Sequence, residues 1–159
     1  MSKKVKIGLI GGAAVIAIII ILAAALGGGS GGGVSGNYYY ISTDKIPAIS
    51  YALGENRKIQ SSNTSLQNSV TILRVDYKVP GTAQGMDLRA YFDYLCNNDG
   101  FSMRTAGGDL FGQSAGSSIQ AWRNSVMEGH MVVVQADYDT KGYTITVMHG
   151  QGQAGGGAP

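Results

Sequence analysis

SVTILRVDYKV, Ser69–Val79, alternates apolar and polar side chains over most of its length. In an extended chain, the apolar residues from Leu73 to Val79 would lie on one side and the charged residues from Arg74 to Lys78 on the other. This pattern predicts a β-strand with one face in a core. Pro80 and Gly81 end it, because proline has no amide hydrogen for a strand ladder and both residues favour turns.

The next segment, GMDLRAYFDYLCNNDGF, has the spacing of a helix. Its apolar residues fall at i, i+3, i+4 and i+7 and form one stripe: Leu88, Tyr91, Phe92 and Leu95. Asp87 in the first turn suits the positive end of a helix, and Gly100 is a natural stop. We expect this to be the one helix of the domain.

Several strands are predicted after the helix. FSMRT, Phe101–Thr105, is the first, and three more follow: Ser118–Val126, His130–Tyr138 and Gly142–Gly150. The links between the last three are short, so they predict an antiparallel meander. Gly142 is expected where the last turn needs positive φ.

The segments before the first strand have alternative interpretations. In Ile46–Gln60, alternating apolar residues around a Gly54 turn indicate a hairpin, which we favour, whereas the spacing of Ile46, Ile49 and Leu53 fits a short helix. Ser61–Ser69 predicts a solvated loop or an edge strand. The predicted fold class is α+β, with one helix packed on a mainly antiparallel sheet of about five or six strands.

A long apolar segment lies near the N-terminus. Ile7–Leu26 has no charged side chain, and at ~1.5 Å per residue a helix of this length reaches ~30 Å, the thickness of the hydrocarbon layer. It predicts a transmembrane helix, with the basic residues 1–6 in the cytoplasm and the domain outside the cell membrane. A cleaved signal peptide, with Ala23–Ala25 as its cleavage site, is the alternative, and the domain is then secreted.

The rest of the chain divides by composition. Residues 27–36 are mostly Gly and Ser and predict a flexible linker, residues 37–149 form the α+β domain, and residues 150–159 predict a disordered tail. Of the twelve basic residues, three precede the apolar segment, which leaves nine against ten acidic ones. The domain is therefore slightly acidic, and nucleic acid is not an expected partner.

Catalytic and metal-binding patterns are weak in this sequence. Cys96 lies near the apolar stripe of the helix and is expected to be a small buried residue, and His130 and His149 are expected at the surface. The sequence contains no H-E-x-x-H and no C-x-x-C. No catalytic residue, metal ligand or cofactor is therefore assigned.

The most suggestive candidate for binding is the loop AGGDLFGQSAGSS, residues 106–118. Leu110 and Phe111 lie in it among Gly and Ser residues, and Trp122 and Arg123 follow on the next predicted strand. We expect these four residues to form the lip of a ligand-binding site, with Trp122 as its anchor and Arg123 as its charge. The alternative is that Phe111 packs into the edge of the core. Tyr38–Tyr40 is expected to contact lipid headgroups or to form a first edge strand.

Ile46–Lys58, the helix and the segment from Ser118 to Gly150 together resemble small uncharacterised exported proteins of Gram-positive bacteria. Such proteins carry a membrane or lipoprotein anchor, a low-complexity spacer and one such domain, so the resemblance implies location and fold but no activity. This chain lacks the cysteine of a lipoprotein anchor.

Three functions are consistent with these predictions. The first is a membrane-tethered extracytoplasmic module that binds an envelope protein or another cell-surface component. The second is an extracytoplasmic enzyme with an unrecognised site. The third is a structural envelope subunit that forms homo-oligomers through small residues of the apolar segment, such as Gly8 and Gly12.

Overall fold

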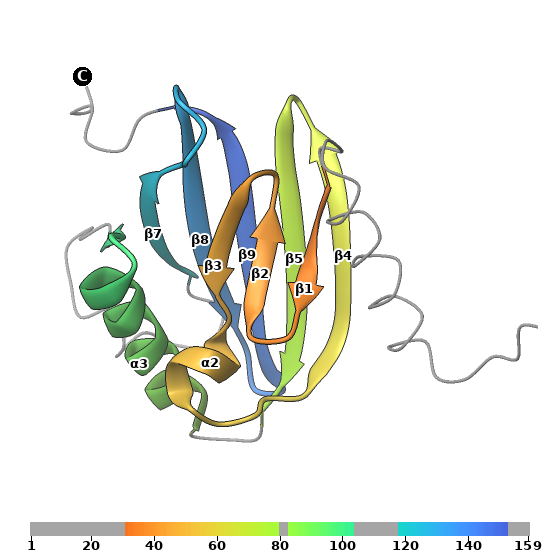
Figure 1. The fold of residues 1–159 in the computed structure, drawn as a ribbon. Coiled ribbons are helices and arrows are strands. Elements are labelled where there is room, and N and C mark those ends of the chain that lie inside the picture. Colours follow the sequence, from red (N-terminus) through yellow and green to blue (C-terminus); the bar gives the residue numbers. More distant parts are fainter. Residues whose placement is uncertain (1–30, 80–82, 104–117, 153–159) are drawn as a thin grey trace, which may run out of the picture.

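The computed structural model describes residues 31–79, 83–103 and 118–152, which form an α+β fold with two antiparallel sheets (Figure 1). The large sheet has six strands in the order β4 (Ile59–Gln67), β5 (Val70–Lys78), β9 (Gly142–Gln151), β8 (His130–Tyr138), β7 (Ser118–Asn124) and β6 (Ser102–Met103). The small sheet consists of β1 (Gly32–Ser35), β2 (Tyr38–Ile41) and β3 (Asp44–Pro47). The helices are α2 (Ile49–Leu53) and α3 (Ala83–Asn98).

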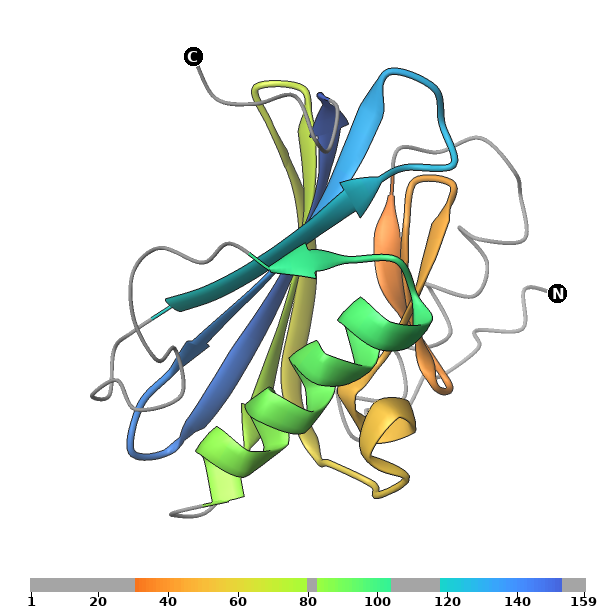
Figure 2. The same cartoon turned by 90° about the vertical axis from the view of Figure 1, so that its left-hand side faces the viewer.

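Helix α3 and the small sheet lie side by side on the same face of the large sheet (Figures 1 and 2). The predicted stripe of α3 is fully buried, as are the alternate residues Leu73 and Val75 of β5 and Ile145 and Val147 of β9. The predicted strand at 69–79, the helix and the meander β7–β8–β9 are therefore confirmed, but α3 begins at Ala83, so Asp87 is not in its first turn as predicted. One hydrophobic core joins all three elements.

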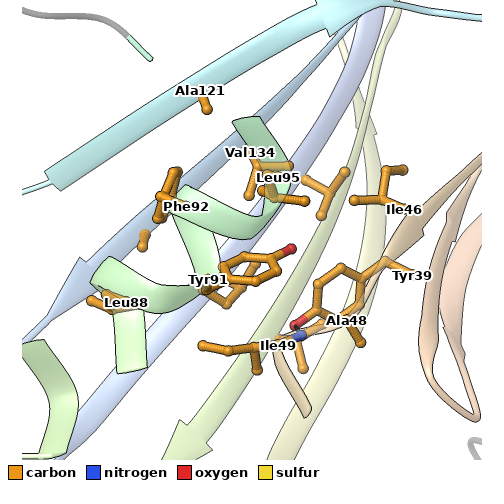
Figure 3. Packing of buried hydrophobic residues seen from close by; sticks show 14 of the residues in the cluster. Tyr39, Ile46, Ala48, Ile49, Leu88, Tyr91, Phe92, Leu95, Ala121 and Val134 are labelled. Carbon is orange, nitrogen blue, oxygen red and sulfur yellow. Dashed lines mark hydrogen bonds between the residues drawn. The ribbon is translucent and has the colours of Figure 1, made fainter. Parts of the chain in front are cut away.

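Tyrosine hydroxyl groups connect the layers of this core, in which Figure 3 shows Tyr39 and Tyr91. The Tyr91 hydroxyl of α3 donates to the Pro47 carbonyl at 3.0 Å, and the Tyr39 and Tyr77 hydroxyls lie 2.7 Å apart. Burial raises the pKa of Tyr77 to about 12, so its hydroxyl stays neutral at ordinary pH. These bonds fix the small sheet against both α3 and the large sheet.

The segment Ile46–Gln60 is not the hairpin that the sequence favoured. Residues 49–53 form the short helix α2, so the domain has two helices among its described residues and not one. Gly54 ends α2 with φ 66°, and its N–H and that of Glu55 bond to carbonyls of the preceding turn. The side chain of Ile49 is buried, and this tertiary contact outweighs the local alternation.

Ser61–Ser69 is mostly edge strand, since β4 runs to Gln67 and pairs with β5. Asn68 and Ser69 then turn the chain with positive φ at both positions, as a two-residue hairpin of type I′ requires. Tyr38–Tyr40 lies in β2, the central strand of the small sheet, so the prediction of an edge strand is wrong.

The predicted boundaries of the domain were also too narrow. Gly32–Ser35, assigned from composition to the linker of residues 27–36, forms β1 and pairs with β2. Strand β9 continues to Gln151, inside the predicted tail. The predicted membrane span 7–26 lies outside the described residues, and neither of the two helices described has the length and hydropathy of a membrane span.

Candidate functional site

The large sheet has a second face, turned away from α3 and the small sheet, and no described element covers it (Figures 1 and 2). Apolar side chains lie opposite one another across four of its strands, in the order Ile72, Met148, Val133 and Trp122. We call these four residues the Trp122 row. All four are only half-buried, whereas the residues next to them in sequence, such as Leu73, Val132 and Ala121, are buried.

Polar side chains lie beside the Trp122 row on the same face. Gln120 Nε2 donates to Gln135 Oε1 at 2.8 Å, and Gln135 Nε2 donates to Asp137 Oδ2 at 2.8 Å. Thr146 of β9 lies opposite Gln135, and Arg74 of β5 lies opposite Thr146. We call this set of five residues the polar band. Apolar and polar rows therefore lie next to each other on one surface.

A shallow hollow of about 660 Å³ continues the polar band toward the β8–β9 turn. Its lining includes cations and carboxylates: Arg74, Asp76, Asp137, Asp139 and Lys141. The Ser61 and Thr144 hydroxyls both donate to Asp76, at 2.5 Å and 2.6 Å. Partial burial raises the pKa of Asp76, but these two bonds and the Arg74 guanidinium hold that pKa below its usual value. The hollow therefore presents both positive and negative charges.

Trp122 and Arg123 lie on opposite faces of the large sheet. Consecutive residues of a strand point to opposite faces of a sheet, and Trp122 lies on the uncovered face while Arg123 lies on the face toward the core. Leu110 and Phe111, the other two residues of the predicted lip, lie outside the described residues. Of the four predicted site residues, only Trp122 is therefore placed on a candidate binding surface.

Arg123 belongs to a buried cluster of charges. Its Nη1 donates to Asp44 Oδ1 at 2.9 Å, and the Asp44 side chain has no exposed surface. Its Nε lies 3.6 Å from Asp99 Oδ2, which is an ion pair beyond hydrogen-bond length, and its guanidinium lies 5.1 Å from the centre of the Phe101 ring. Asp44 begins β3, so Arg123 holds the small sheet against β7. Its role as a ligand-binding charge stays a prediction.

His149 and His130 were both expected at the surface. His149 is buried, at 5% exposure, and His130 stacks on it with ring centres 5.1 Å apart. Ser125 Oγ donates to Asp44 Oδ2 and lies 3.1 Å from His149 Nε2. The prediction for His149 was wrong because β9 extends past Gly150 and keeps His149 inside the sheet.

The residue types of this cluster are those of a serine hydrolase, but their arrangement differs. In a catalytic triad, the carboxylate orients one ring nitrogen of the histidine and the serine lies at the other. Here Asp44 Oδ2, at 3.7 Å, and Ser125 Oγ, at 3.1 Å, approach the same nitrogen of His149. Ser125 also accepts a bond from the Met127 amide. The arrangement is that of a structural polar cluster.

The cluster predicts a pH dependence of stability. Burial lowers the pKa of His149, although Asp44 raises it, and His130 lowers it further. The unfolded chain therefore binds more protons, and the free energy of unfolding should fall as the pH falls below about 6.5. Urea denaturation between about pH 7.5 and pH 5.5 should show this loss in the wild type. A His149→Asn variant should lose less stability over that range, and an equal loss in both would contradict the assignment to His149.

Cys96 and the segment DYDTKG are the remaining sequence candidates for chemistry. Cys96 is half-buried on α3, and burial raises the pKa of its thiol, which disfavours the nucleophilic thiolate. Asp139 Oδ1 accepts bonds from the Lys141 and Gly142 amides, so DYDTKG forms the predicted hairpin turn. Within ranges 31–79, 83–103 and 118–152, no three metal-ligating side chains come together.

Comparisons with known proteins give no further assignment, because no family model, curated protein or solved structure matches this chain. The surface residues that sequence reasoning missed are Ile72, Val133 and Met148. In each strand, the residue occupies one of the alternating positions at which the other residues are mostly polar. An apolar residue among these polar positions is the sequence signal that predicts an exposed apolar surface.

Proposed function

We propose that this chain is a membrane-tethered extracytoplasmic module that binds an envelope protein through the uncovered face of its large sheet. The observation that carries the proposal is the Trp122 row, four half-buried apolar side chains in line across β5, β9, β8 and β7. The apolar segment Ile7–Leu26 and its preceding lysines support the tether.

The chemistry of this face fits a protein better than other partners. Protein interfaces combine an apolar centre, often with Trp or Met, and a polar rim that makes hydrogen bonds. The Trp122 row supplies the centre, and the polar band supplies amide, hydroxyl and guanidinium groups beside it. A lipid or nucleic-acid surface would favour an excess of cations, and here Asp76 and Asp137 offset Arg74.

Site-specific crosslinking in cells tests the proposal. A photoreactive amino acid at Asn124, two residues from Trp122 on the same strand and exposed, should give a discrete protein adduct with the full-length chain. The same amino acid at Asn97, exposed on α3, should not give it. The adduct identifies the partner by mass spectrometry.

A matched pair of substitutions provides the control. Met148→Lys places a charge in the middle of the Trp122 row and should remove the Asn124 adduct, whereas Met86→Lys, at a position 74% exposed on α3, should leave it. Circular dichroism establishes that both variants are folded. An adduct that survives Met148→Lys in the folded chain, an adduct only with lipid or polysaccharide, or no adduct at Asn124 would contradict the proposal.

A further inference from the structure

The outer edge of β4 is the longest strand edge in the described structure that has no pairing partner. Strand β4 ends the large sheet, and its nine residues pair only with β5. The edge strands of the small sheet have four residues each, and β6 has two. Every second residue of β4 therefore directs its N–H and C=O groups away from the sheet.

Proteins usually protect such an edge, and β4 has little protection. Lysine, proline, inward charges and bulges are the common devices. The sequence of β4, IQSSNTSLQ, has no charged residue and no proline, and its one irregularity lies between Ile59 and Ser61 at its start. From Ser61 to Gln67 the register with β5 is regular. This stretch is able to accept another strand.

The neighbouring small sheet leaves this edge open. Thr64 Oγ1 donates to the Gly32 carbonyl of β1 at 2.6 Å, so β1 contacts β4 through a side chain on the face toward the core. None of the described elements pairs with the outer backbone of β4. The strand is thus fixed in an extended form in the single chain, which lowers the entropic cost of pairing with another strand.

We propose that β4 pairs antiparallel with β4 of a second copy, so that two large sheets join into one continuous sheet. In a dimer with two-fold symmetry, each copy contributes the same strand to the interface, and the two strands run antiparallel. Because β4 is uncharged throughout, no register brings like charges together, and Ser and Thr side chains lie opposite one another. If the whole strand overlaps with its copy, the two-fold axis passes Asn63. If only the regular part from Ser61 to Gln67 overlaps, the axis passes Thr64, the next residue.

Charge substitution at Asn63 tests this pairing in the full-length chain in mild detergent. Asn63→Lys places two like charges beside the axis and should raise the dimer dissociation constant at least about fivefold, and Asn63→Glu should do the same. An equal mixture of the two variants should form a heterodimer at least as tight as the wild-type dimer. Light scattering after gel filtration measures the molar mass over a range of concentrations.

Two further measurements separate β4 pairing from other contacts. Asn97→Lys, the same change on an exposed face of α3, should leave the wild-type dimer intact. Amide hydrogen exchange should show alternate residues of β4 becoming protected as concentration rises. A wild-type chain that stays monomeric, a dimer unaffected by Asn63→Lys, or β4 amides whose exchange is independent of concentration would overturn the proposal. The second of these outcomes would indicate the apolar segment 7–26 as the interface.

Discussion

Replacement of Arg123 with methionine should lower the free energy of unfolding by about 3 kcal/mol, because it leaves the Asp44 carboxylate buried without its cation. The Asp44 side chain has no exposed surface, and the Arg123 side chain is 14% exposed. Methionine keeps much of the apolar contact with Phe101 and removes the charge. Urea denaturation followed by the fluorescence of Trp122, the chain's one tryptophan, measures the change.

A double variant separates the charge from the packing. Asp44→Asn removes the carboxylate but keeps one oxygen, which can accept the bond from the Val126 amide, and an NH2 group, which can donate to Ser125 Oγ. In this background Arg123→Met should cost about 1 kcal/mol or less, since no buried anion remains. If Arg123→Met is as costly in the Asp44→Asn background as in the wild type, the ion pair is not what holds β3 to β7. An unchanged stability of Arg123→Met alone would contradict the assignment directly.

The position of Arg123 also shows how much of the site was predictable. The sequence correctly predicted a strand at Ser118–Val126, and a strand sends adjacent side chains to opposite faces. Applied to Trp122 and Arg123, that rule is enough to place the two side chains on different faces from the sequence alone. What the sequence could not supply is the partner of Arg123, because Asp44 lies 79 positions away along the chain.

The same division between local and distant information holds for the fold. The pattern of β5 and the stripe of α3 depend only on neighbouring residues and on which side is buried, so both were predictable. Gly32–Ser35 forms a strand because Val34 lies opposite Tyr39 of β2, while its own composition is that of a linker. Ile49 begins α2 because its side chain packs into the common core, and the local alternation of residues gives no information on that contact. Tertiary contact decided both segments.

Gly142 gives the second large effect, for a reason that differs from the predicted one. Its backbone is not in the positive-φ region that the turn was expected to need. An added Cβ would instead lie 2.0 Å from the Tyr77 carbonyl oxygen of β5. Strand β5 is held between β4 and β9 and cannot move away without breaking a ladder. Gly142→Ala should therefore lower the free energy of unfolding by about 3 kcal/mol in urea denaturation.

Gly85 is the matched control for this substitution. It lies in α3, and an added Cβ would meet nothing within 4 Å. Alanine has a higher helix propensity than glycine, so Gly85→Ala should raise the free energy of unfolding by about 0.5–1 kcal/mol. The two identical substitutions should thus change stability in opposite directions. If Gly142→Ala is also neutral or stabilising, then β5 and β9 do not approach as closely at this turn as the structure shows, and the register of Lys78 with Gly142 is incorrect.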